Sequence, residues 1–154
     1  MKRLFFAIIL GAFLGCAGGL GYYYRVEKQN FKVGYWKYPP AIVDCTHGSL
    51  STSRLIESVG FWRQYEFEFS FIEDDPPTSI CNLDQIHGFI IIKNDTLNWP
   101  TIGKTESSNA IDGKIKSVLI RLNVGDGNSP KLLEHELGHA LGYHHKNDLG
   151  HIMH

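Results

Sequence analysis

The chain has 154 residues, of which 43% are hydrophobic and 20% are charged, and its formal net charge is −1. This length suits one domain with its own core, and the composition is that of an ordinary globular protein. There is no basic excess, so the composition excludes the strongly basic class of nucleic-acid-binding chains, and we expect no nucleic-acid partner.

The first 24 residues indicate export from the cytoplasm. Lys2 and Arg3 precede an uncharged run over residues 4–24, which is long enough to span a bilayer. The run favours an uncleaved membrane anchor. A cleaved signal peptide and a lipoprotein segment modified at Cys16 are the alternatives, and the sequence leaves them open.

The chain therefore divides into an N-terminal segment and one domain. We expect a membrane anchor or signal segment at 1–24, a linker at 25–34 and a domain at 35–154. The domain is expected outside the cytoplasm, either membrane-anchored through residues 4–24 or secreted after cleavage. In such an oxidising compartment, Cys45 and Cys81 form either a disulfide or a pair of buried thiols.

Apolar spacing predicts the elements of the domain. Leu55, Val59 and Trp62 recur at helical spacing, whereas Phe67 and Phe69 belong to an alternating strand pattern. The predicted order begins with a strand within 34–45, whose pairing Pro39–Pro40 limits, and a helix within 49–65 that is capped by Ser51 or Thr52. Strands follow at 65–73, 87–95 and 115–125, with a loop at 96–114 between the last two. The final helix has Ser129 as its cap and Pro130 in its first turn. This order predicts an α/β or α+β fold, in which helices pack on a mixed sheet.

The last predicted helix carries the chemistry. Six of the eight histidines lie in the last twenty residues, within and after the stretch "HELGHALGYHH" at 135–145. His135 and His139 are four apart, so both imidazoles lie on one helix face and reach one ion. Gly142 can turn the chain back and bring His145 round as a third ligand. Three histidines with one open position are typical of a catalytic zinc site.

This stretch resembles the long zinc-binding motif of the metzincin metallopeptidases. "HKNDLGHIM" at 145–153 is similar to the matrixin pattern, in which Asp148 and Gly150 precede a Met-turn methionine at Met153. The stretch 102–123 also resembles bacterial matrixins, where a Gly-x-Thr loop leads to a strand ending in Leu-Asn. The resemblance covers about residues 86–153.

The resemblance implies a fold and a mechanism. It implies a metzincin-like mixed twisted sheet with a backing helix, an active-site helix and a truncated C-terminal subdomain. Zn²⁺ would be held by His135, His139 and His145, with Met153 as an apolar floor. A zinc-bound water would attack the peptide bond of a peptide or protein substrate, with Glu136 as general base. Extended substrate would lie along an edge strand, for which residues 116–125 are the expected segment.

Two departures from the family pattern keep a second function open. Lys146 stands where matrixins usually have serine, and His154 follows the methionine in place of Tyr-Pro. The main hypothesis is a zinc-dependent metalloendopeptidase. The alternative is a non-catalytic zinc-binding domain at a membrane, which would have no need of Glu136. The motif spacing favours His145 over His144 as the third ligand.

Overall fold

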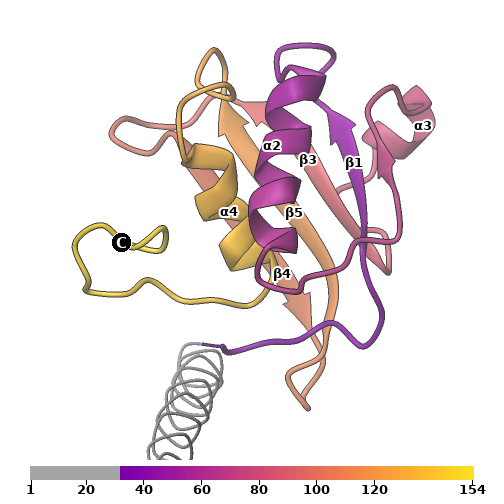
Figure 1. Cartoon of the computed structure of the whole chain (residues 1–154). Coiled ribbons are helices and arrows are strands. Elements are labelled where there is room, and N and C mark those ends of the chain that lie inside the picture. Colours follow the sequence, from indigo (N-terminus) through magenta and orange to yellow (C-terminus); the bar gives the residue numbers. More distant parts are fainter. Residues whose placement is uncertain (1–31) are drawn as a thin grey trace, which may run out of the picture. The chain divides into compact units, whose positions relative to one another are not determined.

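A five-stranded sheet runs through the computed structural model, which describes residues 32–154. The strands are β1 (Ala41–Cys45), β2 (Ile72–Glu73), β3 (Phe89–Asp95), β4 (Gly103–Asn109) and β5 (Ile115–Asn123). Their spatial order is β2-β1-β3-β5-β4 (Figure 1). Four strands are parallel, and β4 runs antiparallel to β5 at one edge. The predicted mixed α/β architecture is confirmed at this level.

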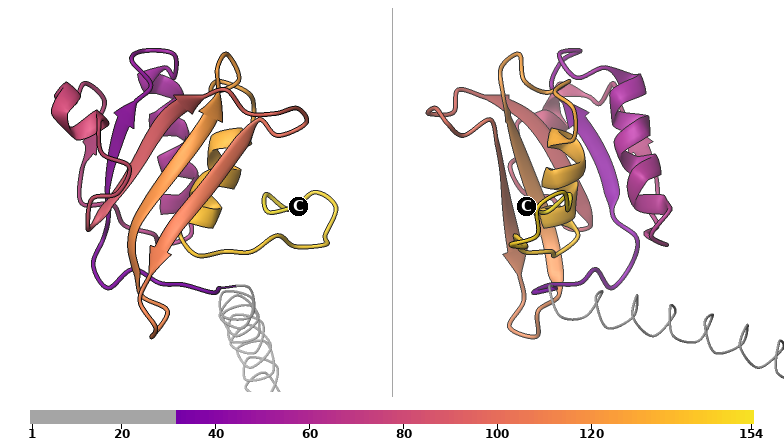
Figure 2. Two further views of the ribbon diagram at one scale, coloured as in Figure 1. Left: turned by 180° about the vertical axis from the view of Figure 1, so that it is seen from behind. Right: turned by 60° about the vertical axis from the view of Figure 1, so that its left-hand side comes forward.

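Two helices cover one face of this sheet. They are α2 (Thr52–Arg63) and α4 (Leu132–Ala140), which lie on the same side in the right-hand view of Figure 2. A third, one-turn helix, α3 (Thr78–Cys81), lies beside β1. Of the two predicted caps, it is Ser51 and not Thr52 that caps α2, because the Ser51 hydroxyl accepts a hydrogen bond from the Arg54 N–H at 3.3 Å.

The three consecutive isoleucines of β3 enter two different cores. Ile90 and Ile92 belong to the larger core, which lies under α2 and α4. Ile91 points to the other face and packs with Val43 and Leu119, its register partners on β1 and β5. A strand that is buried on both faces reads as a continuous apolar run, and this explains "FIII".

Cys45 and Cys81 form a disulfide, which settles a question that the sequence leaves open. The bond joins the end of β1 to α3, with the two Cα atoms 5.4 Å apart. Both cysteines belong to the smaller core with Ile91 and Leu119. The disulfide therefore fastens α3 over the face of the sheet that α2 and α4 leave uncovered.

The predicted strand at 65–73 is wrong over most of its length. Only Ile72–Glu73 pairs with β1, and the preceding residues form a turn and an extended segment after α2. The alternating aromatics are nevertheless partly buried: Phe69 is 7% exposed, and the Phe67 ring lies edge-on to Trp62 at 5.6 Å. Their alternation reflects packing against α2 and does not reflect strand pairing.

Two predictions near the expected site also need correction. The predicted loop at 96–114 contains β4, and β4 is the edge strand, whereas β5 lies inside the sheet between β3 and β4. The last helix begins at Leu132, and not with Ser129 and Pro130. Ser129 donates its N–H to the Asp126 carbonyl at 2.8 Å and so belongs to the preceding turn.

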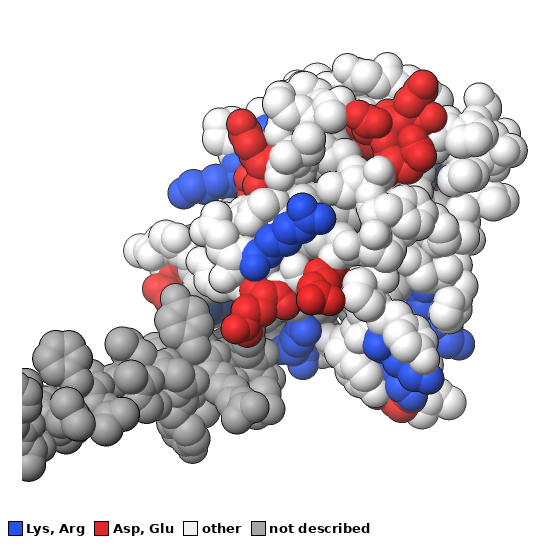
Figure 3. Space-filling model, turned by 45° about the vertical axis from the view of Figure 1, so that its right-hand side comes forward, with Lys and Arg blue, Asp and Glu red and all other residues white. Residues whose placement is uncertain are grey.

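Charged side chains on this domain form small, separate groups of either sign, as the face in Figure 3 shows. Many of them are paired locally. Arg121 on β5 contacts both Asp95 and Glu106, and Lys93 Nζ lies 2.8 Å from Asp84 Oδ1. Such exposed pairs contribute little to stability.

The N-terminal predictions fall outside the described residues. These include the anchor or signal segment at 1–24, the lipidation alternative at Cys16 and most of the linker at 25–34. Over residues 32–154, the structure contains no helix with the length and apolar content needed to cross a bilayer.

Candidate metal centre

Helix α4 presents two histidines on one side and an apolar face on the other. Leu133, Leu137 and Ala140 are fully buried in the larger core. His135 and His139 lie one turn apart on the outward side and are partly exposed. The helix therefore folds by burying one stripe, which leaves the two imidazoles side by side at the surface of the domain.

Gly142 ends α4 and reverses the chain. Its φ is 96°, and its N–H donates to the His139 carbonyl at 2.9 Å. A Cβ at this position would lie 2.8 Å from the carbonyl carbon of Gly34, so only glycine satisfies both the backbone angle and the space. The predicted turn is confirmed, and it brings residues 143–145 back along the helix.

This reversal brings a third imidazole to the first two. The Nε2 atoms of His135, His139 and His145 lie 3.0–3.1 Å from one another. They form a three-histidine cluster that can bind a metal ion. His144 is exposed and lies outside this cluster.

Backbone carbonyls orient two of the three rings. His135 Nδ1 lies 2.7 Å from the Ile152 oxygen, and His139 Nδ1 lies 2.8 Å from the Tyr143 oxygen. A neutral ring that donates from Nδ1 keeps a free lone pair on Nε2, which is the protonation state of a metal ligand. Burial lowers the pKa of His139 and the neighbouring histidines lower it further, and together they outweigh the hydrogen bond with the Tyr143 carbonyl, which acts in the opposite direction. The lowered pKa favours the neutral ring.

The spacing of the nitrogens also fits a metal ion. A tetrahedral ion with metal–nitrogen bonds of ~2.0–2.1 Å holds its ligand nitrogens ~3.3 Å apart. The observed separations of 3.0–3.1 Å are close to this value. Imidazole is a ligand for zinc, copper, nickel and iron, so the donor set by itself does not choose among them.

Glu136 is the buried acidic group beside the cluster. It is 5% exposed, and its Oε2 accepts a hydrogen bond from Thr105 Oγ1 on β4 at 2.5 Å. Burial raises the pKa of Glu136 above its ordinary value, although the bond from Thr105 and the nearby His135 act in the opposite direction. A carboxylate with a raised pKa is a better proton acceptor than an exposed one.

A cleft lies beside His135 and Glu136. It has a volume of about 410 Å³ and is lined by His135 and Glu136 from α4, by Ile102 and Gly103 at the start of β4, and by residues 150–152 and 154 of the last segment. Two of these last residues are the histidines His151 and His154, and His151 Nδ1 also accepts the Met153 N–H at 3.0 Å. Neither of them belongs to the three-histidine cluster.

Met153 is buried against α4. It is 1% exposed, and it packs so closely on Gly138 that a Cβ there would collide with its sulfur and would lie 2.8 Å from Trp62. The Met153 carbonyl accepts the Lys146 N–H at 2.7 Å, and Lys146 Nζ lies 3.3 Å from Asp148. The segment after α4 is thus closed into a loop by contacts between its own residues.

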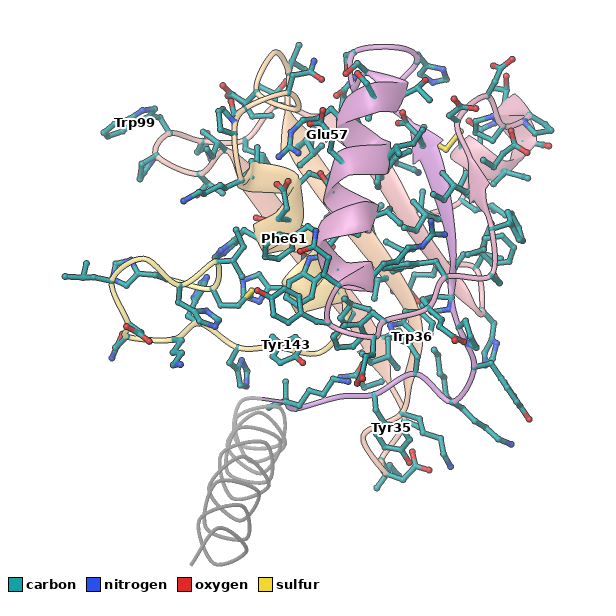
Figure 4. All side chains as sticks on the ribbon, viewed as in Figure 1. Tyr35, Trp36, Glu57, Phe61, Trp99 and Tyr143 are labelled. Atoms are coloured by element: carbon teal, nitrogen blue, oxygen red, sulfur yellow. A yellow bond between two sulfur atoms is a disulfide. The ribbon has the colours of Figure 1, made fainter. Side chains whose placement is uncertain are left out.

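Aromatic rings fix the end of α4 on the side away from the cleft. Tyr143 stacks on Trp62 with ring centroids 5.5 Å apart, and Phe61 contacts Trp62 edge-on. Trp36 donates its indole N–H to the Ala140 carbonyl at 2.9 Å. Figure 4 shows Phe61, Tyr143 and Trp36 around the lower ends of α2 and α4, whereas Trp99 projects from a distant loop.

Sequence reasoning missed the contribution of β4 to this site. Gly103 and Thr105 contact Glu136, yet the stretch "GKTESSN" has too few apolar residues to predict a strand. His47 and His87 lie outside the three-histidine cluster.

Comparisons with protein families and with curated proteins give no match for this chain. The class of this protein therefore comes from its fold and its site alone: it is a mixed α/β domain that carries a three-histidine cluster next to a buried glutamate.

Proposed function

We propose that this chain is a zinc-dependent metalloendopeptidase of the metzincin type. The observation that carries the proposal is the convergence of three imidazole Nε2 atoms within 3.1 Å, beside a cleft that is lined by one of them, His135, and by the buried Glu136. A metal-binding module needs the three histidines only. The glutamate beside them supports hydrolysis.

Two further features support the metzincin type. Met153 is buried against Gly138, the residue before His139, and a methionine packed on the histidine-bearing helix supports the Met-turn role that the resemblance implies for it. The sheet ends beside α4 in the edge strand β4, which within the described residues pairs with β5 alone. Its other edge offers backbone groups to an extended peptide, so β4 takes the role expected of residues 116–125.

Each residue has a distinct role in the proposed reaction. His135, His139 and His145 would hold the zinc ion, which when bound supplies a Lewis acid that polarises the peptide carbonyl. Glu136 accepts a proton from the attacking water and returns it to the leaving amine. The carbonyls of Ile152 and Tyr143 keep the rings of His135 and His139 in the tautomer that leaves Nε2 free.

The test compares Glu136→Gln with the wild type for zinc content and for cleavage of casein and of quenched fluorescent peptides, with a chelator control. Glutamine keeps the size of the side chain but removes the base. We expect one zinc per chain in both proteins and a loss of cleavage of ~10²–10⁴-fold in the variant.

Histidine variants separate the proposal from its alternative. His145→Ala should lose zinc, whereas His144→Ala, the matched control one residue away, should keep it. If the wild type holds zinc firmly but cleaves no substrate, the non-catalytic zinc-binding domain would replace the peptidase as the proposed function. Equal cleavage by Glu136→Gln and wild type would refute the role of Glu136.

A further inference from the structure

Two residues of β4 enclose the carboxylate of Glu136. Thr105 Oγ1 lies 2.5 Å from Oε2 and 3.1 Å from the backbone oxygen of the same residue. At Gly103, a Cβ would lie 2.6 Å from Oε1 and 2.9 Å from Leu132 Cδ1. Residues two apart on a strand share one face, so Gly103 and Thr105 meet Glu136 from the same side of β4.

The two contacts have different effects. The Thr105 hydroxyl holds one carboxylate oxygen by a hydrogen bond to a charged group, which is about twice as strong as a neutral one. Gly103 leaves room for the other oxygen. The last torsion of a glutamate has a broad energy profile, so a fixed direction for its carboxylate has to come from such neighbours.

Thr105 is well suited to this task because it is itself held rigidly. Its β-branched side chain has few rotamers, and its backbone pairs with Ile120 in the antiparallel ladder of β4 and β5. Ile120 is completely buried in the larger core. The backbone that carries the hydroxyl is therefore held by the sheet, while the hydroxyl itself reaches Glu136 on α4.

We propose that Thr105 is a positioning residue for Glu136, and that Gly103 is required as the space into which the carboxylate fits. This inference rests on the proposed peptidase function, because the carboxylate direction matters to proton transfer in that reaction. The edge strand then has two roles: one edge of β4 is open to peptide, and one of its faces orients the base.

The main test uses Thr105→Val, which keeps the shape of the side chain and removes the hydroxyl, and Thr105→Ser, which restores it. We expect Thr105→Val to lower kcat roughly 10- to 100-fold, as a misplaced reacting group does. Its KM and zinc content should stay near the wild-type values, and Thr105→Ser should recover most of the kcat. Thr96→Val, an exposed threonine outside the site, is the matched control.

A second variant tests the space beside Gly103. Gly103 has no positive φ, so Gly103→Ala adds a methyl group without backbone strain, and this group would collide with Oε1. We expect a loss of kcat similar to that of Thr105→Val while zinc content is kept. A Gly103→Ala variant with wild-type kcat would remove Gly103 from the proposal.

Crystal structures of the metal-free wild type and of the Thr105→Val variant give a readout that does not need activity. The carboxylate of Glu136 should change direction in Thr105→Val and keep it in Thr105→Ser. If the wild type cleaves peptides but Thr105→Val has both the wild-type kcat and an unmoved carboxylate, the positioning role is overturned and the peptidase stands. If the wild type cleaves nothing, the peptidase fails, and the position of the carboxylate in the variants still decides what Thr105 does.

Discussion

Arg54 and Glu134 form an ion pair between α2 and α4, directly next to His135. Arg54 Nη1 lies 2.6 Å from Glu134 Oε1, and its second amino group bonds the other carboxylate oxygen. Each of the two side chains is 11% exposed. Burial alone would raise the pKa of Glu134, but the hydrogen bonds and the charge of Arg54 outweigh it and lower this pKa. The pair ties α4 to α2 one residue before His135.

Removing one partner should therefore be costly. We expect Arg54→Met to reduce the free energy of unfolding by about 3–5 kcal/mol, because it leaves the Glu134 carboxylate buried without its cation. Arg63→Met, on the same helix at an exposed position, is the matched control and should change stability by no more than about 0.5 kcal/mol. Urea unfolding of the metal-free proteins measures both, and equal losses in the two variants would contradict the role of the ion pair.

At the scale of elements, the turn after α4 decides whether the third histidine reaches the first two. Tyr143 N–H donates to the Gly138 carbonyl at 3.0 Å, and Gly142 N–H to that of His139. These bonds satisfy carbonyls that a helix end leaves without partners. Gly142 also lies against Gly34, so the turn is packed on both sides.

Two glycines with nearly the same backbone angle allow a controlled test of this turn. Gly142 has φ 96° and is crowded by Gly34, whereas Gly125 has φ 91° and nothing within 4 Å of an added Cβ. Gly125→Ala should cost about 1–2 kcal/mol through its backbone alone. Gly142→Ala should cost clearly more and should weaken metal binding. Thermal melting and zinc titration check this, and equal losses would show that the close approach of Gly34 does not matter.

The elements that the sequence predicts well are those whose signal is local. The cap at Ser51, the apolar run of β3 and the turn at Gly142 each follow from the residues themselves. The strand β4 could not be predicted, because an edge strand with an exposed face needs no apolar alternation. The predicted strand at 65–73 fails for the opposite reason, since Phe67 and Phe69 pack into the larger core beside α2 without pairing in a sheet.

The same difference between local and long-range signals applies to the site. The spacing of His135, His139 and His145 follows from helix periodicity and one glycine turn, and the structure brings all three together. The contact of Thr105 with Glu136 joins residues 31 positions apart, and no local pattern in the sequence predicts it.

At the scale of the whole molecule, the disulfide bears on where the protein works. Cys45 and Cys81 are 36 residues apart, and both are buried in the smaller core. Closing a loop of that length stabilises the folded state by about 4 kcal/mol in the chain-entropy description. Such bonds persist in oxidising compartments, which supports the proposed export through residues 4–24.

Export and disulfide formation should therefore occur together. Cells that express the full chain should carry the protein in the membrane fraction or release a cleaved form, with the Cys45–Cys81 bond intact on non-reducing gels. A variant that lacks residues 2–24 should stay in the cytoplasm with reduced cysteines, and it should unfold at lower denaturant concentration than the exported form. Finding the full chain uncleaved, soluble and reduced in the cytoplasm would refute the export proposal.

Residues 33–36 connect the N-terminal end of the domain to the end of α4 and to β5 by hydrogen bonds. Val33 donates to the Gly142 carbonyl at 2.8 Å, and Trp36 donates to that of Ala140 at 2.9 Å. Tyr35 bridges to the start of β5, accepting the Ile115 N–H at 2.8 Å. Tension applied to the chain upstream of Val33 is thus passed first to the end of α4 and the beginning of β5. A tether on that side would load the turn that brings His145 to the other two histidines, so we expect metal affinity to fall when the chain is pulled there.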